Sequence, residues 1–342
     1  MRTILVTGGA GFIGSNFVRY MAHRYPNYHI TVLDKLTYAG NLKNLDGVLG
    51  SNVSFVRGDI CDPTIVNHLV AGHDAVVNFA AETHVDRSLI DPGAFVQTDV
   101  FGTFVLLEAC RMAGRVRFVQ VSTDEVYGDV PPGAHSLETD RLNPRSPYSA
   151  SKAGGDLLCL GFFHSHRVPV SITRAANTVG PYQYPEKLVP LMVTNAILGE
   201  PLPVYGDGLQ VRDWLHASDH CAAIDLVLHQ GEAGEIYNVG VGYEHPNIEV
   251  VDLILSEIGA SPSLIRHVAD RHGHDRRYSL DCSKIRALGW APVYTFERTI
   301  CETARWYVEH RSWWEEIRSR PDYQAFYQRN YGYRLQSIAT SS

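Results

Sequence analysis

Short apolar runs alternate with longer amphipathic stretches through the first half of the chain. The runs are rich in β-branched residues and cover positions 3–7, 30–34, 53–57, 75–79, 116–121 and 170–173. Stretches with helical periodicity cover 11–25, 95–112, 148–164 and, further on, 218–229. Apolar strands that alternate with helices are typical of a parallel sheet with helices on both faces. The pattern therefore predicts an α/β fold, a Rossmann-type doubly wound parallel sheet of six strands.

The pattern changes after about residue 176, where prolines divide the chain into short elements. This change predicts a smaller C-terminal α/β substrate domain that closes over the carboxyl edge of the sheet. We expect residues 1–176 and 213–237 to form the sheet domain, residues 177–212 and 238–335 to form the second domain, and residues 336–342 to be a disordered tail.

Composition narrows the classes of function. The 342 residues carry a net charge of −7, so a nucleic-acid partner, which requires a concentrated basic face, is not expected. No apolar run approaches the ~18 residues that span a bilayer, which argues against a membrane segment. The six cysteines are scattered without a C-x-x-C pair, so we expect reduced thiols and no metal site. The cytoplasm is the default location.

A glycine-rich turn follows the first apolar run. Gly8, Gly11 and Gly14 stand in the run G-G-A-G-F-I-G, which opens the first predicted helix. Glycines in this context let the backbone approach a pyrophosphate at a helix N-terminus. Asp34 ends the second run, where a carboxylate accepts hydrogen bonds from a ribose diol and repels a 2′-phosphate. These residues predict NAD rather than NADP; the alternative is a glycine-rich turn with a solvated aspartate.

Asp59 follows the third apolar run. Because the carboxyl ends of parallel strands share one edge, its side chain can reach the adenine of the same cofactor. The alternative is that Asp59 only caps the helix that follows.

Tyr148 and Lys152 stand four residues apart, which places both on one face of a helix. An ammonium near a phenol favours the phenolate and lowers the tyrosine pKa. Such a tyrosine can take a hydroxyl proton while hydride leaves for a nicotinamide. A lone Y-x-x-x-K is common by chance, so the interpretation depends on the preceding dinucleotide fold.

Thr123, Asp124 and Glu125 follow the fifth apolar run. Consecutive strand residues point to opposite faces, so both acids serve one ligand only if the chain leaves the strand here, as Gly128 suggests. Oxidation of a sugar hydroxyl at C4 makes the C5 hydrogen acidic. One carboxylate can then remove that proton, and a second, kept protonated, can donate to the departing C6 hydroxyl. The alternative is two solvated loop acids.

These motifs resemble the extended short-chain dehydrogenase/reductase superfamily and, within it, the dTDP-glucose 4,6-dehydratases. The likeness covers residues 2–335, and related epimerases usually carry small residues where Asp124 and Glu125 stand. Its most specific stretches are 7–14, 34–41, 80–88, 122–128, 185–190 and 212–214.

The resemblance implies a role for each catalytic residue. Tyr148 is the base for O4, helped by Thr123 and Lys152. Glu125 removes the C5 proton, and Asp124 protonates the leaving water. NAD takes hydride from C4 and returns it to C6, which gives a 4-keto-6-deoxy sugar. NAD is regenerated in every turnover and is expected to stay bound.

The resemblance also implies binding residues. For the cofactor they are Gly8, Gly11, Phe12, Ile13, Gly14, Asp34, Lys35, Thr37, Asp59, Ile60, Ala80, Ala81, Tyr148 and Lys152. For the nucleotide sugar they are Thr83, Asn177, Glu186, Lys187, Pro203, Val204, Tyr205, Arg212, Asn247, Arg271, His274 and Asp275. Taken singly, Arg212 or Lys187 could equally form a surface ion pair. In relatives, the helices at 95–112 and 148–164 pair into a four-helix homodimer interface.

The sequence departs from the family pattern after the sixth apolar run. Thr178 and Val179 stand where the family usually has Asn and Tyr, while the preceding Asn177 is kept. Three alternatives stay open: a dehydratase for another nucleotide sugar, such as a UDP-linked one, a 4-epimerase, and a catalytically silent NAD-sensing scaffold. The acid pair disfavours the epimerase, and an intact Thr123, Tyr148 and Lys152 disfavours the scaffold.

Overall fold

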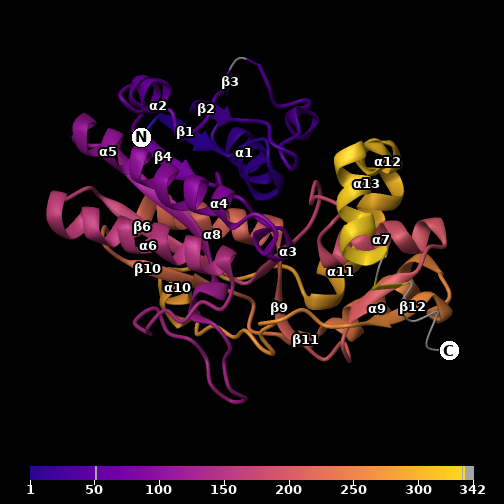
Figure 1. The fold of residues 1–342 in the computed structure, drawn as a ribbon. Coiled ribbons are helices and arrows are strands. Elements are labelled where there is room, and N and C mark those ends of the chain that lie inside the picture. Colours follow the sequence, from indigo (N-terminus) through magenta and orange to yellow (C-terminus); the bar gives the residue numbers. More distant parts are fainter. Residues whose placement is uncertain (51, 333, 336–342) are drawn as a thin grey trace.

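The computed structural model describes residues 1–50, 52–332 and 334–335, so the tail predicted at 336–342 lies outside the described residues. Its centre is a sheet of seven strands in the order β10-β6-β5-β4-β1-β2-β3, all paired in parallel (Figure 1). The strand order reverses between β1 and β4, the point at which open α/β sheets bind ligands. The strands are β1 (Thr3–Thr7), β2 (His29–Asp34), β3 (Val53–Arg57), β4 (Ala75–Asn78), β5 (Arg117–Thr123), β6 (Val170–Ala175) and β10 (Ile236–Val239).

The predicted α/β fold is confirmed, but the count of six strands was wrong by one. The six predicted strands begin and end within two residues of the apolar runs, and β10 joins the sheet beside β6. β10 is short and contains the polar Asn238, so no apolar run marks it. Contacts from distant segments hold it instead: Asn238 Nδ2 donates to the Ser136 carbonyl oxygen at 2.9 Å, and its Oδ1 accepts from the Tyr127 hydroxyl at 2.8 Å.

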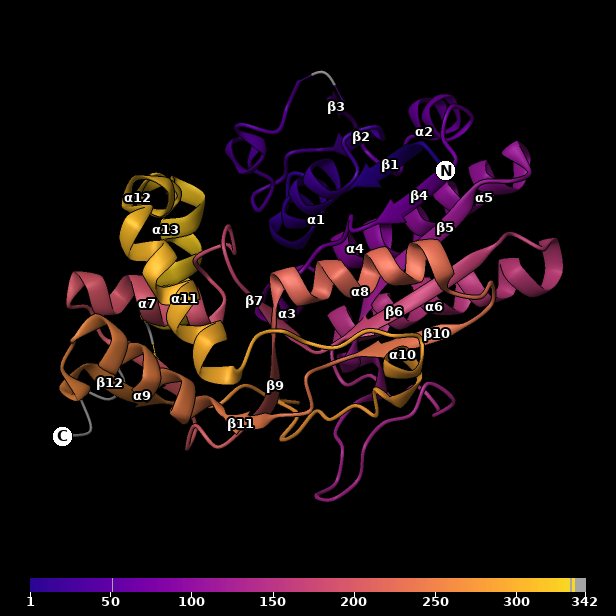
Figure 2. The same ribbon diagram turned by 180° about the vertical axis from the view of Figure 1, so that it is seen from behind.

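Helices cover both faces of the sheet, as the apolar strands predicted. Two of them pack together on one face, which Figure 2 shows in front, and three cover the other face. Each face has its own hydrophobic cluster. The first face carries α1 (Phe12–Arg24) and α8 (Ala217–Gln230); the second carries α2 (Pro63–Val70), α5 (Thr103–Ala113) and α6 (Pro147–His166).

The helix α2 was not predicted, although the sequence carries its start signal. Asp62 caps the helix by accepting a hydrogen bond from the Thr64 amide at 2.8 Å, and Pro63 is its first residue. An aspartate followed by proline is typical of a helix N-terminus.

The helix predicted at 95–112 begins earlier and contains an irregular segment. It consists of α4 (Pro92–Phe95), a π-helical stretch η2 (Val96–Gly102) and α5. Residues Pro92–Ala113 are long and apolar enough to cross a membrane, but half of their most apolar window is buried inside the protein. The segment packs against α2 and α6, so it is a core helix of the sheet domain.

A second group of elements, which has its own hydrophobic cluster, lies beside the carboxyl ends of the strands (right in Figure 1). It contains a three-stranded sheet, β11-β9-β7, and a two-stranded sheet, β12-β8. The boundaries between the two domains stay a prediction. The strands here are β7 (Asn177–Val179), β8 (Leu202–Tyr205), β9 (Val211–His216), β11 (Glu244–Pro246) and β12 (Ile265–Val268); the helices are α7 (Leu188–Leu198), α9 (Asn247–Ile258), α11 (Phe296–Glu309), α12 (Arg311–Ser319) and α13 (Pro321–Tyr327).

Several short elements complete the described chain. Two of them shape the site below: η3 follows β5 directly, and α3 is the first helix after β4. These elements are η1 (Leu42–Leu45), α3 (Val85–Ser88), η3 (Asp124–Tyr127), η4 (Pro262–Leu264), α10 (Ser283–Ala287) and η5 (Gln328–Gly332).

Candidate active site

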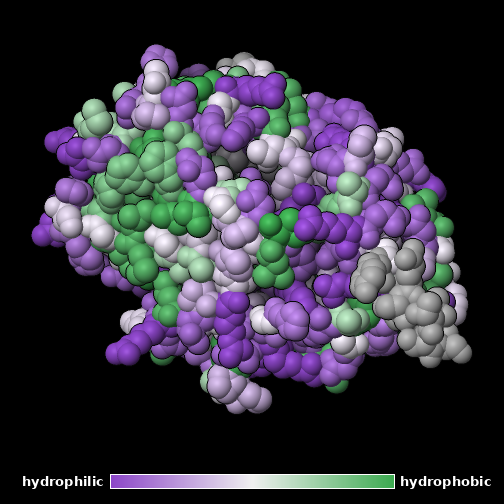
Figure 3. Space-filling model, in the orientation of Figure 1, coloured by the Kyte–Doolittle hydropathy of each residue, from purple (hydrophilic) through white to green (hydrophobic). Residues whose placement is uncertain are grey.

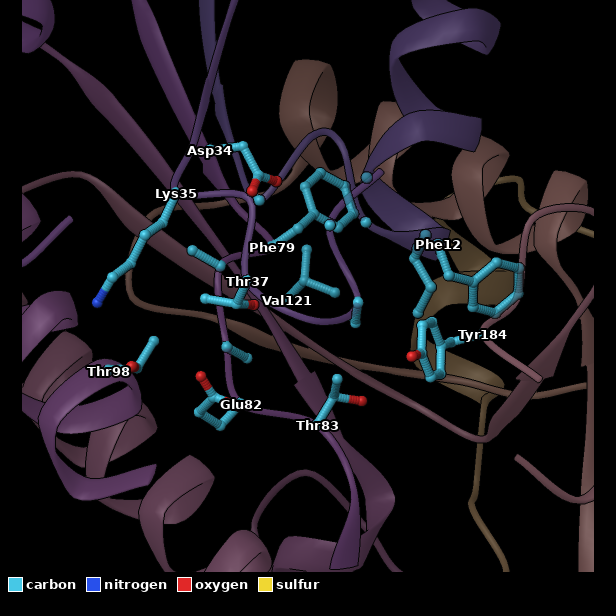
Figure 4. Close-up of a pocket in the computed structure, with 18 of the residues that line it drawn as sticks. Phe12, Asp34, Lys35, Thr37, Phe79, Glu82, Thr83, Thr98, Val121 and Tyr184 are labelled. Atoms are coloured by element: carbon cyan, nitrogen blue, oxygen red, sulfur yellow. The ribbon is translucent and has the colours of Figure 1, made fainter. Parts of the chain in front are cut away.

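A cavity runs along the carboxyl ends of β1 to β5 and is bordered on its far side by residues 183–187 of the second domain. Every residue predicted to bind the cofactor lines it, as do Thr83, Glu186 and Lys187 from the predicted sugar-binding set. Figure 4 shows Asp34 at the top of the view and Glu82 and Thr83 at the bottom. The cavity therefore lies at the switch point of the sheet, where a dinucleotide is expected.

In the glycine turn at the end of β1, main-chain atoms of neighbouring segments lie in close contact. Gly8 has φ +67°, and a Cβ there would lie 2.5 Å from the Ala80 amide nitrogen. A Cβ on Gly14 would lie 2.3 Å from the Gly8 carbonyl oxygen. The first turn of α1 carries no acidic residue and no capping side chain. Its free amides, at a helix N-terminus that faces the cavity, suit a pyrophosphate.

Asp34 closes the other side of the turn. Its Oδ2 accepts from the Ala10 amide at 2.9 Å, and its Oδ1 accepts from the Leu36 amide at 2.8 Å. Burial raises the pKa of this carboxyl, and the two amide hydrogen bonds oppose that rise. A carboxylate fixed at this place accepts from a ribose diol and repels a 2′-phosphate, so the residues fit NAD.

Asp59 is not the cap of the following helix, because Asp62 fills that role. Asp59 Oδ1 accepts from the Cys61 amide at 2.9 Å, and its Oδ2 lies 2.6 Å from Lys35 Nζ. The pair borders the cavity at the end of β3. The alternative of a plain helix cap was therefore wrong.

The two adjacent acids lie where the chain leaves β5. The short helix η3 begins at Asp124, and Thr123 Oγ1 accepts from the Glu125 amide at 3.2 Å. Thr123 also donates to Asp124 Oδ1 at 3.2 Å. Asp124 is buried and Glu125 is half-buried, so they are not solvated loop acids. The turn required for both acids to serve one ligand is present.

The surroundings of the two carboxyl groups give them different roles, one as a proton donor and the other as a proton acceptor. Burial raises the pKa of Asp124 to about 8, and the charge of Glu125 adds to this rise. Burial also raises the pKa of Glu125, but the positive charges of Arg271, Lys187 and Arg212 oppose it. At neutral pH Asp124 therefore holds a proton, while Glu125 faces the cations that favour its ionised form.

Tyr148 and Lys152 project from the first turns of α6. Lys152 Nζ donates to the Val121 carbonyl oxygen at 2.8 Å. Burial raises the pKa of Tyr148 well above its usual value; the charges of Glu125, Asp99 and Asp124 add to this, and a hydrogen bond with Thr123 opposes it. The expectation that Lys152 lowers this pKa does not hold, because burial of the phenol and the charges of three nearby acids outweigh an ammonium that is bound to a carbonyl oxygen.

Asp99 is a buried acid behind this pair that the sequence did not reveal. Its Oδ2 accepts from the Ser151 hydroxyl at 2.6 Å, and its Oδ1 accepts from the Glu82 amide at 3.0 Å. Burial raises the pKa of Asp99 to about 6, and the charge of Lys152 opposes this rise. Burial and the charge of Asp99 raise the pKa of Glu82 to about 7. The other lining residues that were missed include Thr98, Gln183 and Tyr184.

Most residues predicted for the nucleotide sugar lie outside the lining of the cavity, beyond Glu125. The charges of Arg212, Arg271 and Asp275 all shift the pKa of Glu125, so these residues lie near its carboxylate. Asn177 and Asn247 each have a buried Oδ1 without a hydrogen-bond partner among the described residues. The predicted residues outside the cavity lining are Thr123, Asp124, Glu125, Asn177, Pro203, Val204, Tyr205, Arg212, Asn247, Arg271, His274 and Asp275.

Arg212 and Lys187 do not form surface ion pairs. Arg212 is 4% exposed, its Nη2 donates to the Asp275 carbonyl oxygen at 2.9 Å, and its Cζ lies 4.1 Å from the centre of the Tyr278 ring. Lys187 donates to the carbonyl oxygen of Thr83. Both cations are held by backbone oxygens, which leaves their charge available to an anionic ligand.

The two departures from the family pattern face away from the cavity. Thr178 Oγ1 lies 2.9 Å from Nδ1 of the buried His220 on α8, and Val179 belongs to the hydrophobic cluster of the second domain. Neither lines the cavity. His220 Nε2 is buried without a partner among the described residues.

Comparisons with known proteins agree with this geometry. Residues 5–303 match the family profile described as GDP-mannose 4,6 dehydratase. A dTDP-glucose 4,6-dehydratase from Streptomyces niveus is 53% identical over 325 residues, which cover 93% of this chain and 96% of that protein. The solved structure of DesIV, a dTDP-glucose 4,6-dehydratase from Streptomyces venezuelae with NAD bound, is 50% identical with a TM-score of 0.89, over 92% of this chain and 99% of that one.

An epimerase shares the fold at lower identity. The UDP-glucose 4-epimerase from Thermus thermophilus, in complex with NAD, is 32% identical with a TM-score of 0.84, over 90% of this chain and 99% of that one. The fold and the NAD site are thus common to two kinds of enzyme, and the residues beyond the cofactor must distinguish them.

Proposed function

The chain belongs to the dTDP-glucose 4,6-dehydratase family of the extended short-chain dehydrogenase/reductase superfamily, and we propose that it converts dTDP-glucose to dTDP-4-keto-6-deoxyglucose and water. It is an NAD-dependent hydro-lyase. The observation that carries this proposal is the adjacent pair of the buried Asp124 and the half-buried Glu125 next to Tyr148, because elimination needs an acid and a base beside the oxidising group. An epimerase has no use for a protonated buried acid at this place.

Tyr148 begins the reaction as its phenolate, which accepts the proton of the C4 hydroxyl, with Thr123 hydrogen-bonded to its oxygen. The chemistry that NAD supplies when bound is reversible hydride storage: the hydride leaves C4 of the sugar and returns to C6 in the same turnover. Gly8, Gly14 and Asp34 would hold its pyrophosphate and adenosine ribose.

The acid pair carries out the elimination. Glu125 takes the C5 proton, which the adjacent C4 ketone makes acidic. The C6–O bond breaks as Asp124 donates its proton to the leaving oxygen, so the group departs as water. Glu125 then returns a proton to C5, after exchange with water. Over the full cycle, the proton that Tyr148 took from O4 replaces the one that Asp124 gave to water.

The nucleotide diphosphate binds beyond Glu125. Arg212 is a planar cation on an aromatic ring with no carboxylate partner among the described residues, which suits phosphate oxygens. Asn247 begins α9 and Asn177 lies on β7, each with a free buried acceptor that can take hydrogen bonds from the ligand. Tyr205 and Pro203 on β8 would flank the base.

The enzyme works as a homodimer in the cytoplasm. Large apolar side chains are exposed where Figure 1 places α5 and α6, and Figure 3 shows hydrophobic residues gathered there. The six cysteines are free thiols, as in proteins of a reducing compartment. A monomer leaves this apolar face in water. The face includes Val96 (56% exposed), Phe101 (42%), Phe104 (39%), Met112 (66%) and Leu157 (59%). Sedimentation that finds only monomers would contradict the dimer.

A comparison of sugar donors tests the function. We expect dTDP-glucose to give a 4-keto sugar, detected by its absorbance in alkali, faster than UDP-glucose or GDP-mannose do. Faster conversion of UDP-glucose or GDP-mannose would show that the enzyme uses another nucleotide sugar as its substrate. Absence of product from all three would exclude a dehydratase.

Two variants separate the steps. Tyr148→Phe should stop the reaction before any 4-keto sugar forms. Asp124→Asn should slow only the loss of water, so that rapid quenching reveals a 4-keto sugar that still carries its C6 hydroxyl. Absence of that species in a variant that still consumes substrate would exclude Asp124 as the acid.

A further inference from the structure

Arg87 reaches from α3 to Glu186, which lies in the wall at the sugar end of the cavity. Its Nε and Nη2 atoms each lie 2.8 Å from Glu186 Oε2. Glu186 is 2% exposed and lines the cavity. Its other oxygen, Oε1, is buried and has no hydrogen-bond partner within the described parts of the chain. One oxygen of this carboxylate is therefore fixed, while the other is free to accept a hydrogen bond.

Two aromatic rings fix the guanidinium itself. The Arg87 Cζ atom lies 3.7 Å from the centre of the Tyr38 ring and 4.2 Å from that of Phe326. Tyr38 follows the cofactor strand β2, and Phe326 belongs to α13 near the end of the described chain. The same helix steadies the partner, because the Tyr323 hydroxyl donates to the Pro185 carbonyl oxygen at 3.0 Å. A planar cation between rings loses little freedom when it forms an ion pair.

We propose that Arg87 is a positioning residue that aims the free oxygen of Glu186 at one hydroxyl of the sugar ring and thereby sets specificity for that hydroxyl. The inference rests on the proposed function and extends it from the reacting C4–C6 edge to recognition of the rest of the sugar. A sugar that lacks this hydroxyl would leave the buried Glu186 oxygen without a hydrogen-bond partner. The binding free energy lost in this way causes such a sugar to be rejected.

The alternative is that the Arg87–Glu186 pair only joins the two domains. A joining pair would affect stability and the turnover of all substrates alike. A positioning residue affects KM more than kcat, because the contact is equal in the ground and transition states, and it affects one hydroxyl only. The two roles therefore differ in a kinetic readout as well as in stability.

The experiment compares Arg87→Lys with Arg318→Lys in the full-length NAD-bound enzyme. Arg318 is a matched control: it is 8% exposed, lies 2.5 Å from Glu200 and has the rings of Tyr323 and Tyr327 at 5.8 Å, but its partner Glu200, unlike Glu186, does not line the cavity. The substrates are dTDP-glucose and its 2-deoxy and 3-deoxy analogues. Glu186→Gln identifies the hydroxyl whose removal no longer matters.

We expect Arg87→Lys to raise KM for dTDP-glucose by about tenfold or more, with kcat within about threefold of the native value, since uniform binding is lost. Discrimination against the deoxy analogue identified by Glu186→Gln should collapse in Arg87→Lys and persist in Arg318→Lys. Native KM and native discrimination in Arg87→Lys would overturn the proposal, as would a fall in kcat with KM unchanged.

A second variant covers the case in which Arg87→Lys does not fold. Phe326→Leu keeps the ion pair but removes one ring, so a smaller rise in KM and a partial loss of the same discrimination are expected; no change in either would overturn the proposal. Failure of the native enzyme to form a 4-keto sugar would instead reject the proposed function, whatever the variants do.

Discussion

At the cofactor end of the cavity main-chain atoms meet, whereas charged side chains gather around Glu125 near its sugar end. Gly8 and Gly14 bring main-chain atoms into contact, and Asp34 is held by two amides. Around Glu125, by contrast, the charges of Arg271, Lys187 and Arg212 converge from separate segments. The first end should therefore be sensitive to added atoms and the second to lost charge.

The difference follows from what each end must do. A dinucleotide needs a close, fixed cradle, and backbone amides provide one without any side chain. The chemistry at the sugar needs groups with shifted pKa values, and only burial and neighbouring charges produce such shifts. A short segment of the chain is therefore enough to bind the dinucleotide, while the catalytic groups depend on residues from several segments that meet in the fold.

The largest effect is expected from Gly8→Ala at the cofactor end. The new Cβ would lie 2.5 Å from the Ala80 amide nitrogen at φ +67°, so the turn must shift and the pyrophosphate cradle is lost. We expect the purified variant to retain no NAD and to unfold at a markedly lower temperature. Gly47→Ala is the control, because it has φ +80° but open space around its Cβ. Equal loss of NAD in both variants would show that backbone strain, and not crowding, is responsible.

At the sugar end, Glu125→Gln should leave the cofactor in place and remove the base. A general base contributes about 10²–10⁴-fold, so kcat should fall by about that factor. Solvent-deuterium incorporation at C5, measured by mass spectrometry, should fall in parallel, while the NAD content matches the native enzyme. A variant that loses NAD as well would mean that the two ends are not independent.

The pH dependence isolates Asp124. Its pKa is about 8, and it acts as an acid, so it must hold its proton. We expect kcat/KM to be level well below pH 8 and to fall about tenfold per unit well above it, because the protonated fraction falls in that proportion. Asp124→Asn should be slow and lack this alkaline fall. The same fall in that variant would assign it to another group.

The last expected effect is on stability. Asp124 binds its proton more tightly in the folded protein than in the unfolded chain, so the free energy of unfolding decreases as the pH rises from about 4 to about 8. Asp124→Asn removes this loss. It should stabilise the protein by as much as about 5 kcal/mol at pH 8 and by almost nothing at pH 4, as measured by urea unfolding at both values. Equal stability of the two proteins at pH 8 would contradict a buried, proton-holding acid.

The sequence predicted the cofactor end in most of its detail. The strand positions, the glycine turn and Asp34 are local features, because a strand, a tight turn and a helix start each depend on a few neighbouring residues. Prediction failed where partners come from afar: β10 is held by Asn238 contacts to Ser136 and Tyr127, and Asp99 lies behind Lys152 only because α6 packs on η2.

The sequence by itself therefore determined the chain's parallel sheet, its NAD turn and the presence of two adjacent acids after β5. Only the tertiary structure decided what those acids are: it buries Asp124, sets cations beside Glu125 and places Tyr148 among negative charges. Protonation depends on desolvation and on charges brought close through space. Residue order fixes neither of these until the chain has folded.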